Sequence, residues 1–331
     1  MNKKKVVTFV VIVLLIVLGV WYFNCPSCRF GNDSRTVTIT TGSTSGTYFA
    51  IGKAIAEAVN KSGELNVTSE KGNGSVDNIQ SVADKDTELG ITQADIAYWA
   101  YNGEHVFKNA PIKSIRAICA LYPEQIQLLV AKRSNINKLE DLKGKRVGVG
   151  LHGSGVEGDV KALLDQAGMS MDDILTGFLD FSTITTLFSH NRLDAGFIVA
   201  GVPTAPLTEL FMTINKRPEC FDVTLLNFDD EFLSKLQKAY PFIIPSVIPA
   251  GTYEELGEIK TPAVMSLLVV REDADEEMVY NFLEALYKNI DIVQNAHKSG
   301  ANVKLETAMQ GVTIPFHPAA EKFFRDKGIL K

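Results

Sequence analysis

The sequence is poor in the residues that carry metal and redox chemistry. Its 331 residues include four cysteines and five histidines. The histidines form no H-x-x-x-H or H-E-x-x-H pair, so these zinc motifs are absent. Cys25 and Cys28 form a C-x-x-C, but the strand and helix of a redox motif and a second pair of metal ligands are missing around it. Cys119 lies in an apolar run and is expected in the core. We therefore expect no metal, no redox role and no cofactor.

Basic charge is also too scarce for a nucleic-acid partner. Lysine and arginine number 33 against 39 acidic residues, which gives a net charge of −6. Nucleic-acid binding needs a basic face, so we expect no such partner. A small anion is not excluded by this balance, because local backbone dipoles can bind it.

Long apolar runs are lacking except at the N-terminus. Three lysines at 3–5 precede an apolar run over residues 6–23, which is typical of a signal peptide or a signal anchor. Trp21 and Phe23 stand where a cleavage site would need small residues, so an uncleaved anchor is favoured over a cleaved signal. With the lysines inside, the rest of the chain lies in the periplasm or on the extracytoplasmic face of the membrane, tethered there if the anchor is kept.

Strand and helix patterns alternate along the rest of the chain, which predicts an α/β fold with parallel or mixed sheets. Pro123 separates two of the predicted strands. In such sheets, ligands bind outside the carboxyl ends of the strands. The predicted strands are 36–41, 65–69, 89–92, 115–122, 125–131, 146–150, 195–198 and 264–270, and the main predicted helices are 48–59, 76–82, 156–167, 203–214 and 277–289.

Three loops after predicted strands combine glycine with serine or threonine directly before a helix. They are residues 42–47, 72–75 and 153–155. Glycine permits sharp turns and close approach of a ligand, and the first N–H groups of a helix attract carboxylate or phosphate. Converging helix ends of this kind would hold a small anion without arginine. Each loop taken alone is equally consistent with an ordinary helix cap.

Four other residues near strand ends have two interpretations each. Gln93 and Asp95 are either a helix cap or ligand contacts. Tyr48 has helical spacing with apolar neighbours and belongs either to the core or to the ligand site. Glu124 follows Pro123 and is either a solvated turn residue or, if it points into a cleft, a partner for an ammonium group, which favours an amino acid ligand.

Two enzyme hypotheses and one structural hypothesis compete with ligand binding. Gly148–Gly153 matches G-x-G-x-x-G between a strand and a helix, but Asp180, which ends the next strand, lies too far away for the acidic residue of a dinucleotide site. A G-x-S-x-G hydrolase motif is absent, since Thr44 stands at its centre in the first loop. A pure adhesion protein would not need polar loops at strand ends. We expect no enzyme, with a dinucleotide-binding exported enzyme as the alternative.

At these loops the sequence resembles the TAXI family, the solute receptors of tripartite ATP-independent periplasmic (TRAP) transporters. The match is one of pattern and runs from about Thr36 to the C-terminus. The segments that carry it, in order, are 41–52, 74–79, 93–95, 121–124, 153–155, 201–203, 248–253 and 314–318.

The resemblance implies a periplasmic-binding-protein fold of type II kind, whose two lobes are joined by crossing strands and close over the ligand. Residues 1–35 would be the signal or anchor, 36–122 plus 248–331 lobe 1, and 123–247 lobe 2. The implied ligand is glutamate-like or a dicarboxylate, and the implied partners are TRAP membrane subunits.

The resemblance also assigns ligand contacts. In the first lobe they are Ser43, Thr44, Tyr48, Ser75, Asn78 and Gln93, in the second Ser154, Gly155 and Gly201, with Glu124 near the crossover; Gly42, Asp95, Val156 and Pro203 complete the predicted site. The family often has threonine where this chain has Val156, which removes one hydroxyl from the second lobe.

Overall fold

The structure is a computed structural model that describes residues 36–216, 222–254 and 256–331. The predicted signal or anchor and the C-x-x-C lie outside these residues. Within them, no helix is both long enough and apolar enough to cross a membrane.

Ten strands of the described residues form one mixed sheet. The strands are β1 Thr36–Thr40, β2 Asn66–Glu70, β3 Leu89–Gln93, β4 Ile115–Ala131, β5 Arg146–Gly148, β6 Leu175–Gly177, β7 Ala195–Ala200, β8 Val223–Leu225, β9 Ile244–Ile248 and β10 Ile259–Arg271. The α-helices are α2 Thr47–Asn60, α3 Ser75–Asp84, α4 Ala94–Asn102, α5 Gly155–Gln166, α6 Phe181–Ser189, α7 Ala205–Lys216, α8 Asp230–Ala239, α9 Glu276–Lys288, α10 Ile290–Ala296 and α11 Pro318–Asp326.

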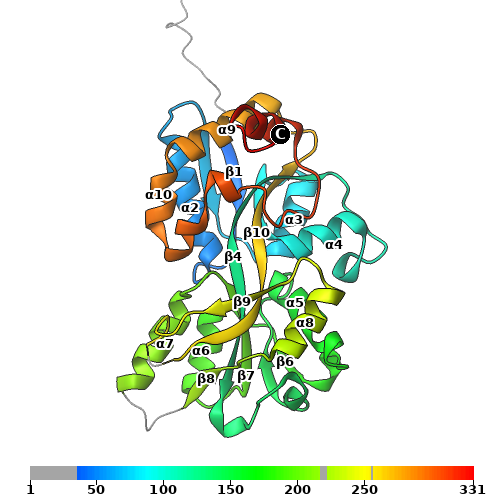
Figure 1. Ribbon diagram of the computed structural model, residues 1–331, viewed down its shortest axis with the longest axis vertical. Helices are drawn as coiled ribbons and strands as arrows, with labels where there is room; N and C mark the ends of the chain where they lie inside the picture. Colours follow the sequence, from blue (N-terminus) through cyan, green and yellow to red (C-terminus); the bar gives the residue numbers. More distant parts are fainter. Residues whose placement is uncertain (1–35, 217–221, 255) are drawn as a thin grey trace, which may run out of the picture. The chain divides into compact units, whose positions relative to one another are not determined.

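Two long strands connect two groups of elements. The sheet order is β2-β1-β3-β10-β4-β7-β5-β6, and β10 is antiparallel to both β3 and β4. At one end of this pair lies the β1 half, which contains β1 to β3 with α2 to α4 and α9 to α11; at the other lies the β7 half, which contains β5 to β8 with α5 to α8 (Figure 1). The pairs β1–β3, β5–β6 and β5–β7 are parallel, as the alternating pattern predicts.

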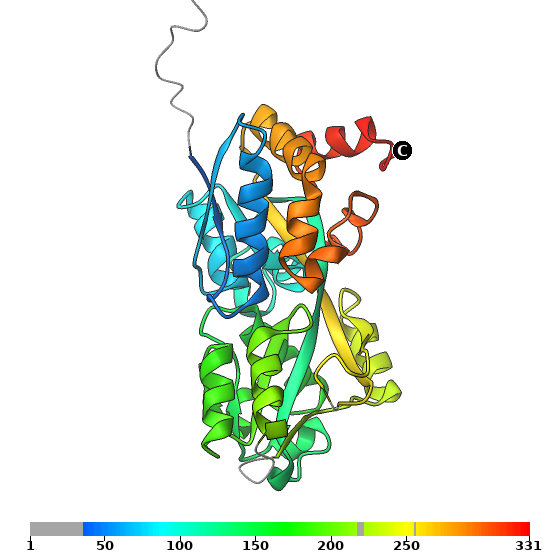
Figure 2. The same ribbon diagram turned by 90° about the vertical axis from the view of Figure 1, so that its left-hand side faces the viewer.

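Helices cover the sheet of each half because the central strands are apolar on both faces. Every residue of β3 and of β7 is buried, which is expected of parallel strands between helix layers. Figure 2 shows α2 beside α10 in the β1 half and α6 beside α7 in the β7 half. Helix α9 buries Val279, Phe282, Leu283 and Leu286 on one face, and Cys119 is fully buried, both as predicted.

The predicted break at Pro123 is wrong. Residues 115–131 form the single strand β4. Pro123 lies opposite Met265 of β10, directly beside an irregularity in the register between Met265 and Leu267. A proline is tolerated where the hydrogen-bond ladder is already interrupted. Glu124 is therefore not a solvated turn residue: it lies within the strand and is 2% exposed.

The limits of the two lobes remain a prediction, because Val37–Lys331 forms one compact unit. The buried apolar residues nevertheless gather in separate clusters. One packs β1 and β3 against α2, α9 and α11, and another packs β5 and β7 against α5. Ile248, Tyr253 and Ile259 pack with residues of β7 and α7.

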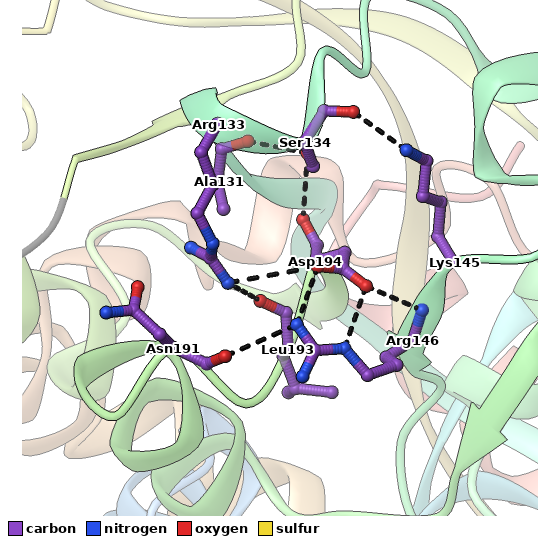
Figure 3. A network of polar contacts seen from close by, with 8 residues as sticks. All are labelled: Ala131, Arg133, Ser134, Lys145, Arg146, Asn191, Leu193 and Asp194. Atoms are coloured by element: carbon purple, nitrogen blue, oxygen red, sulfur yellow. Dashed lines mark hydrogen bonds and ion pairs between the residues drawn. The ribbon is translucent and has the colours of Figure 1, made fainter.

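A charged network ties β5 to the start of β7 (Figure 3). Asp194 accepts hydrogen bonds from Nε of Arg146 at 2.9 Å and from its Nη2 at 2.8 Å. Arg133 lies 3.8 Å from the same carboxylate. The hydrogen bonds from Arg146 lower the pKa of Asp194 to about 2, against the opposing effect of partial burial.

We expect Asp194→Asn to lower the free energy of unfolding at pH 7 by about 2 kcal/mol. Because the folded-state pKa is depressed, this stability is present above the unfolded pKa of about 4 and is lost as the pH falls through about 2. Urea unfolding at several pH values measures it. The exposed Asp172→Asn is the control, and a deficit that does not shrink between pH 4 and pH 2 would contradict the assignment.

Candidate functional site

A cavity of about 60 Å³ lies where the β1 half meets the β7 half. It is built from segments at the carboxyl ends of β1, β2, β3, β5, β6 and β7, together with one residue of β4. The strand-end rule applied to the sequence leads to the same loops. The lining residues are Gly42, Ser43, Gly46, Thr47, Tyr48, Asn73, Gly74, Ser75, Gln93, Glu124, Leu151, Ser154, Gly155, Val156, Leu179, Asp180, Phe181, Val199 and Ala200.

Most of the predicted contact residues come together here. Those that line the cavity are Gly42, Ser43, Tyr48, Ser75, Gln93, Glu124, Ser154, Gly155 and Val156. Thr44, Asn78, Asp95, Gly201 and Pro203 do not line it. Thr44 is exposed. The role of each of these residues in binding remains a prediction.

Asn78 and Gly201 have structural partners instead. Nδ2 of Asn78 donates to the carbonyls of Thr41 at 2.6 Å and Ile91 at 2.7 Å, which joins the end of β1 to β3. At Gly201 a Cβ would lie 2.2 Å from Oγ of Ser299. The close packing accounts for glycine at this position, and the three amide bonds of Asn78 account for its burial.

Four helices begin at the cavity, but they are capped differently. Gly46 and Gly74 precede α2 and α3, and neither helix has a side-chain cap. Ser154 caps α5, and Asp180 caps α6 through the N–H of Thr183. The first turns of α2 and α3 therefore keep N–H groups that no capping side chain satisfies, and such groups suit a carboxylate or another anion.

A buried acid faces the same cavity. The hydroxyl of Tyr48 donates to Oε2 of Glu124 at 3.2 Å, whereas the buried Oε1 has no hydrogen-bond partner among the described residues. Burial raises the pKa of Glu124 well above its ordinary value, the bond from Tyr48 opposes this, and the charge of Asp95 adds to it. A cation donating to Oε1 would satisfy that oxygen and keep the carboxylate ionised.

The lining contains no compensating cation. Glu124 and Asp180 are its charged residues, and no lysine, arginine or histidine belongs to the set that lines the cavity. An anionic group bound here would depend on backbone N–H groups and hydroxyls, and a cationic group would depend on Glu124. The arrangement suits a small molecule that carries both charges.

The two halves touch closely beside the cavity. Oγ of Ser75 donates to Oε1 of Gln93 at 3.1 Å, and Nε2 of Gln93 donates to Oδ2 of Asp159 on α5 at 2.7 Å. Gly155 permits this approach, since a Cβ there would lie 1.3 Å from Oε1 of Gln93. Glycine at the start of α5 thus allows the loop of the β7 half to contact the β1 half.

Sequence reasoning missed the apolar part of the lining, which includes Leu151, Leu179, Phe181 and Val199. No short motif marks these residues. The rule that ligands bind after strands would have pointed to Leu179 and Phe181, because they follow the short strand β6, but the sequence analysis used that segment only to test the dinucleotide hypothesis.

The dinucleotide hypothesis has the right local context but not the space. Gly148 ends β5, and α5 follows the loop. The cavity beside this loop measures about 60 Å³, whereas pockets for drug-sized ligands have roughly 300–1,000 Å³. A Cβ at Gly148 would lie 2.8 Å from Cγ1 of Ile184, so packing against α6 already explains that glycine.

A second hollow of about 570 Å³ lies away from the strand ends. Aromatic residues of α4 and of the segment before β9 line it, among them Tyr98, Trp99, Tyr240 and Phe242. The rings contact one another, with Trp99 and Phe242 centred 5.6 Å apart. It lacks the uncapped helix ends of the smaller cavity.

A family model described as the NMT1-like family matches residues 39–328 of the chain. Among solved structures, the chain is similar to a protein of Bordetella bronchiseptica RB50, with a TM-score of 0.54 and 15% identity over 89% of this chain and 82% of that one. It is also similar to a binding protein component of an ABC phosphonate transporter from Pseudomonas aeruginosa, with a TM-score of 0.52 and 10% identity over 82% of this chain and 80% of that one.

A protein of Archaeoglobus fulgidus is similar as well, with a TM-score of 0.50 and 13% identity over 90% of this chain and all of that one, 100%. At these identities the likeness concerns the fold and not the ligand. The α/β fold of type II periplasmic binding proteins, expected from the sequence, is confirmed.

Proposed function

The chain belongs to the NMT1-like family, and from this premise we propose that it is an extracytoplasmic solute-binding receptor that captures a small amino acid of the glutamate type. The observation that carries the proposal is the buried Glu124, whose Oε1 has no partner, in the same cavity as the uncapped starts of α2 and α3. The proposed activity is binding without catalysis.

The ligand class follows from the two kinds of polar group in the cavity. An α-ammonium group donating to Glu124 would satisfy the unpartnered oxygen, and the carboxylates would accept bonds from the helix starts. A plain dicarboxylate brings no cation, so its charge would meet a buried acid unless that acid is protonated. We therefore favour glutamate or glutamine over a dicarboxylate within the class expected from the sequence.

Capture would take place between the two lobes, 36–122 plus 248–331 and 123–247. Ligand would shift the population of the receptor towards the form in which the halves touch, and membrane subunits would recognise that form. The resemblance to the TAXI family favours TRAP subunits as this partner. The basic and apolar N-terminus supports a location outside the cytoplasm, in the periplasm or tethered to the membrane.

A phosphonate receptor of the ABC type is the alternative, because one similar structure carries that description. Phosphonate oxygens would also suit the uncapped helix starts. A phosphonate without an amine would leave Glu124 unsatisfied.

A thermal-shift panel on the full-length chain tests the proposal. L-glutamate or L-glutamine should raise the melting temperature, since a ligand at 100 times its Kd adds about 2.7 kcal/mol of stability. Succinate, ethylphosphonate and NAD complete the panel. A shift with ethylphosphonate and none with the amino acids would favour the alternative, and a shift with NAD alone would revive the dinucleotide hypothesis.

A further inference from the structure

Two aspartates from opposite halves meet in the interior beside the cavity. Asp95 lies in the first turn of α4 in the β1 half, and Asp159 lies on α5 in the β7 half. Both are 0% exposed, and their carboxyl groups are within hydrogen-bonding reach of one another. The pair bridges the contact between the halves, next to the bond from Gln93 to Asp159.

The pair has too few hydrogen-bond donors for two negative charges. Gln93 donates to Oδ2 of Asp159, but Oδ1 of Asp159 and both oxygens of Asp95 are buried without a partner among the described residues. An ionised carboxylate only accepts hydrogen bonds, so two of them can bond to one another only if one carries a proton. Two bare charges at this distance would repel strongly in a dry interior.

Separation of the halves would remove this constraint. Each carboxylate would then be hydrated, and water would supply the missing donors. The protonation of the pair and the contact between the halves are therefore linked: contact requires a proton that the separated halves do not need.

We propose that Asp95 and Asp159 form a proton-binding pair that couples closure over the solute to the uptake of one proton. This inference rests on the proposed function, because it assumes that solute binding brings the halves together. The receptor would bind its solute more tightly in acidic surroundings and release it more readily as the pH rises.

The direction of the pH effect follows from the pKa shifts. Burial raises the pKa of Asp95 to about 6, while the bond with Asp159 and two backbone amides of α4 act against it. Burial, followed by the charge and the hydrogen bond of Asp95, raises the pKa of Asp159 well above its ordinary value. The closed form thus binds more protons than the open one, so affinity falls as the pH rises above about 6.

The other titratable groups around the pair do not supply a cation. Glu124 of β4 adds negative charge that raises the pKa of Asp159. The phenol of Tyr48 bonds to Glu124. On α5 itself, Lys161 pairs with Glu157 at 2.6 Å.

Glu124 would not obscure the measurement. It is hydrated and ionised in an open receptor, and an ammonium group would keep it ionised in the closed one. Its net change in protonation with an amino acid is therefore close to zero. With succinate, which has no ammonium group, Glu124 would take up a further proton.

Titration calorimetry of the full-length chain with L-glutamate at pH 7, in buffers of different ionisation enthalpy, counts the protons. We expect about one proton taken up per glutamate, and a Kd that rises up to about tenfold between pH 7 and pH 8. In Asp159→Asn the amide can donate to Asp95 without a proton, so uptake should fall to near zero and the Kd should change less than about threefold. Asp165→Asn, at an exposed position of the same helix, is the matched control and should behave as the wild type.

Melting temperatures without ligand separate the two hypotheses. Acids with raised folded-state pKa values destabilise the protein as the pH rises, so Asp159→Asn should gain more over the wild type at pH 8 than at pH 5. If L-glutamate binds without proton uptake, or if Asp159→Asn leaves the uptake unchanged, the coupling is wrong. If no member of the panel binds, the proposed function fails; an equal gain at both pH values would then overturn the proton pair as well.

Discussion

Glu124→Gln should lower the affinity for L-glutamate by about 30- to 4,000-fold. Removal of one partner from a buried, hydrogen-bonded charge pair costs about 2–5 kcal/mol, and each 1.4 kcal/mol corresponds to about a factor of ten in Kd. Glutamine has nearly the shape of glutamate but cannot hold a buried ammonium group by charge. Titration calorimetry of both proteins with L-glutamate gives the ratio.

The same variant should not lose affinity for glutarate, which has the two carboxylates of glutamate and no amine. Removal of the buried negative charge favours an acid without a cation, so the preference between the two ligands should change by more than the glutamate affinity alone. Glu140→Gln, at an exposed position, is the control. An equal loss for glutamate and glutarate would mean that Glu124 has only a structural role.

Glu124→Gln should also fold well. Burial raises the pKa of Glu124, so its charge costs stability at neutral and higher pH, and the neutral glutamine avoids that cost. A melting temperature at pH 8 equal to or above that of the wild type would show that lost binding is not lost folding.

Gly155→Ala should weaken L-glutamate binding by about 10- to 100-fold, because overpacking a close contact costs about 1–3 kcal/mol. The new Cβ would lie 1.3 Å from Oε1 of Gln93 and 2.8 Å from Oγ of Ser75. Gln93 could move aside only by breaking its bonds to Ser75 and Asp159. The contact between the halves should therefore be lost, whereas α5 itself accepts alanine at its first position.

Two further variants separate closure from folding. Gly257→Ala adds a Cβ that meets nothing within 4 Å and should bind like the wild type. Small-angle scattering in the presence of L-glutamate should show a larger radius of gyration for Gly155→Ala than for the wild type. Unchanged affinity in Gly155→Ala would contradict the proposal that the halves must touch for capture.

The helices and parallel strands were predictable because their signals are local. The helix predicted at 277–289 is α9, Glu276–Lys288, and its apolar spacing alone defines the buried face. The strand at 89–92 is β3, and its unbroken apolar run reflects burial on both faces. The loops at 42–47, 72–75 and 153–155 were predicted from turn chemistry, and each contributes residues to the cavity.

Pro123 shows where local signals fail. A proline inside a β-branched run predicts a break, but β10 pairs along both parts of β4 and its irregular register accommodates the proline. This pairing lies about 140 residues away in sequence, for example Met265 opposite Pro123. The same strand continuity places Glu124 in the interior, which decides between its two interpretations.

The sequence by itself determined the α/β class, the helix-start loops that line the cavity, and the balance of charge and chemistry that disfavours nucleic acid and metals. These depend on periodicity, glycine and capping residues within short windows. Only the tertiary structure decided that Asn78 joins strands, that Glu124 faces the cavity with one oxygen unpartnered, and that Asp95 meets Asp159. The reason is physical: burial and charge coupling depend on which distant segments pack together, and sequence spacing does not record that distance.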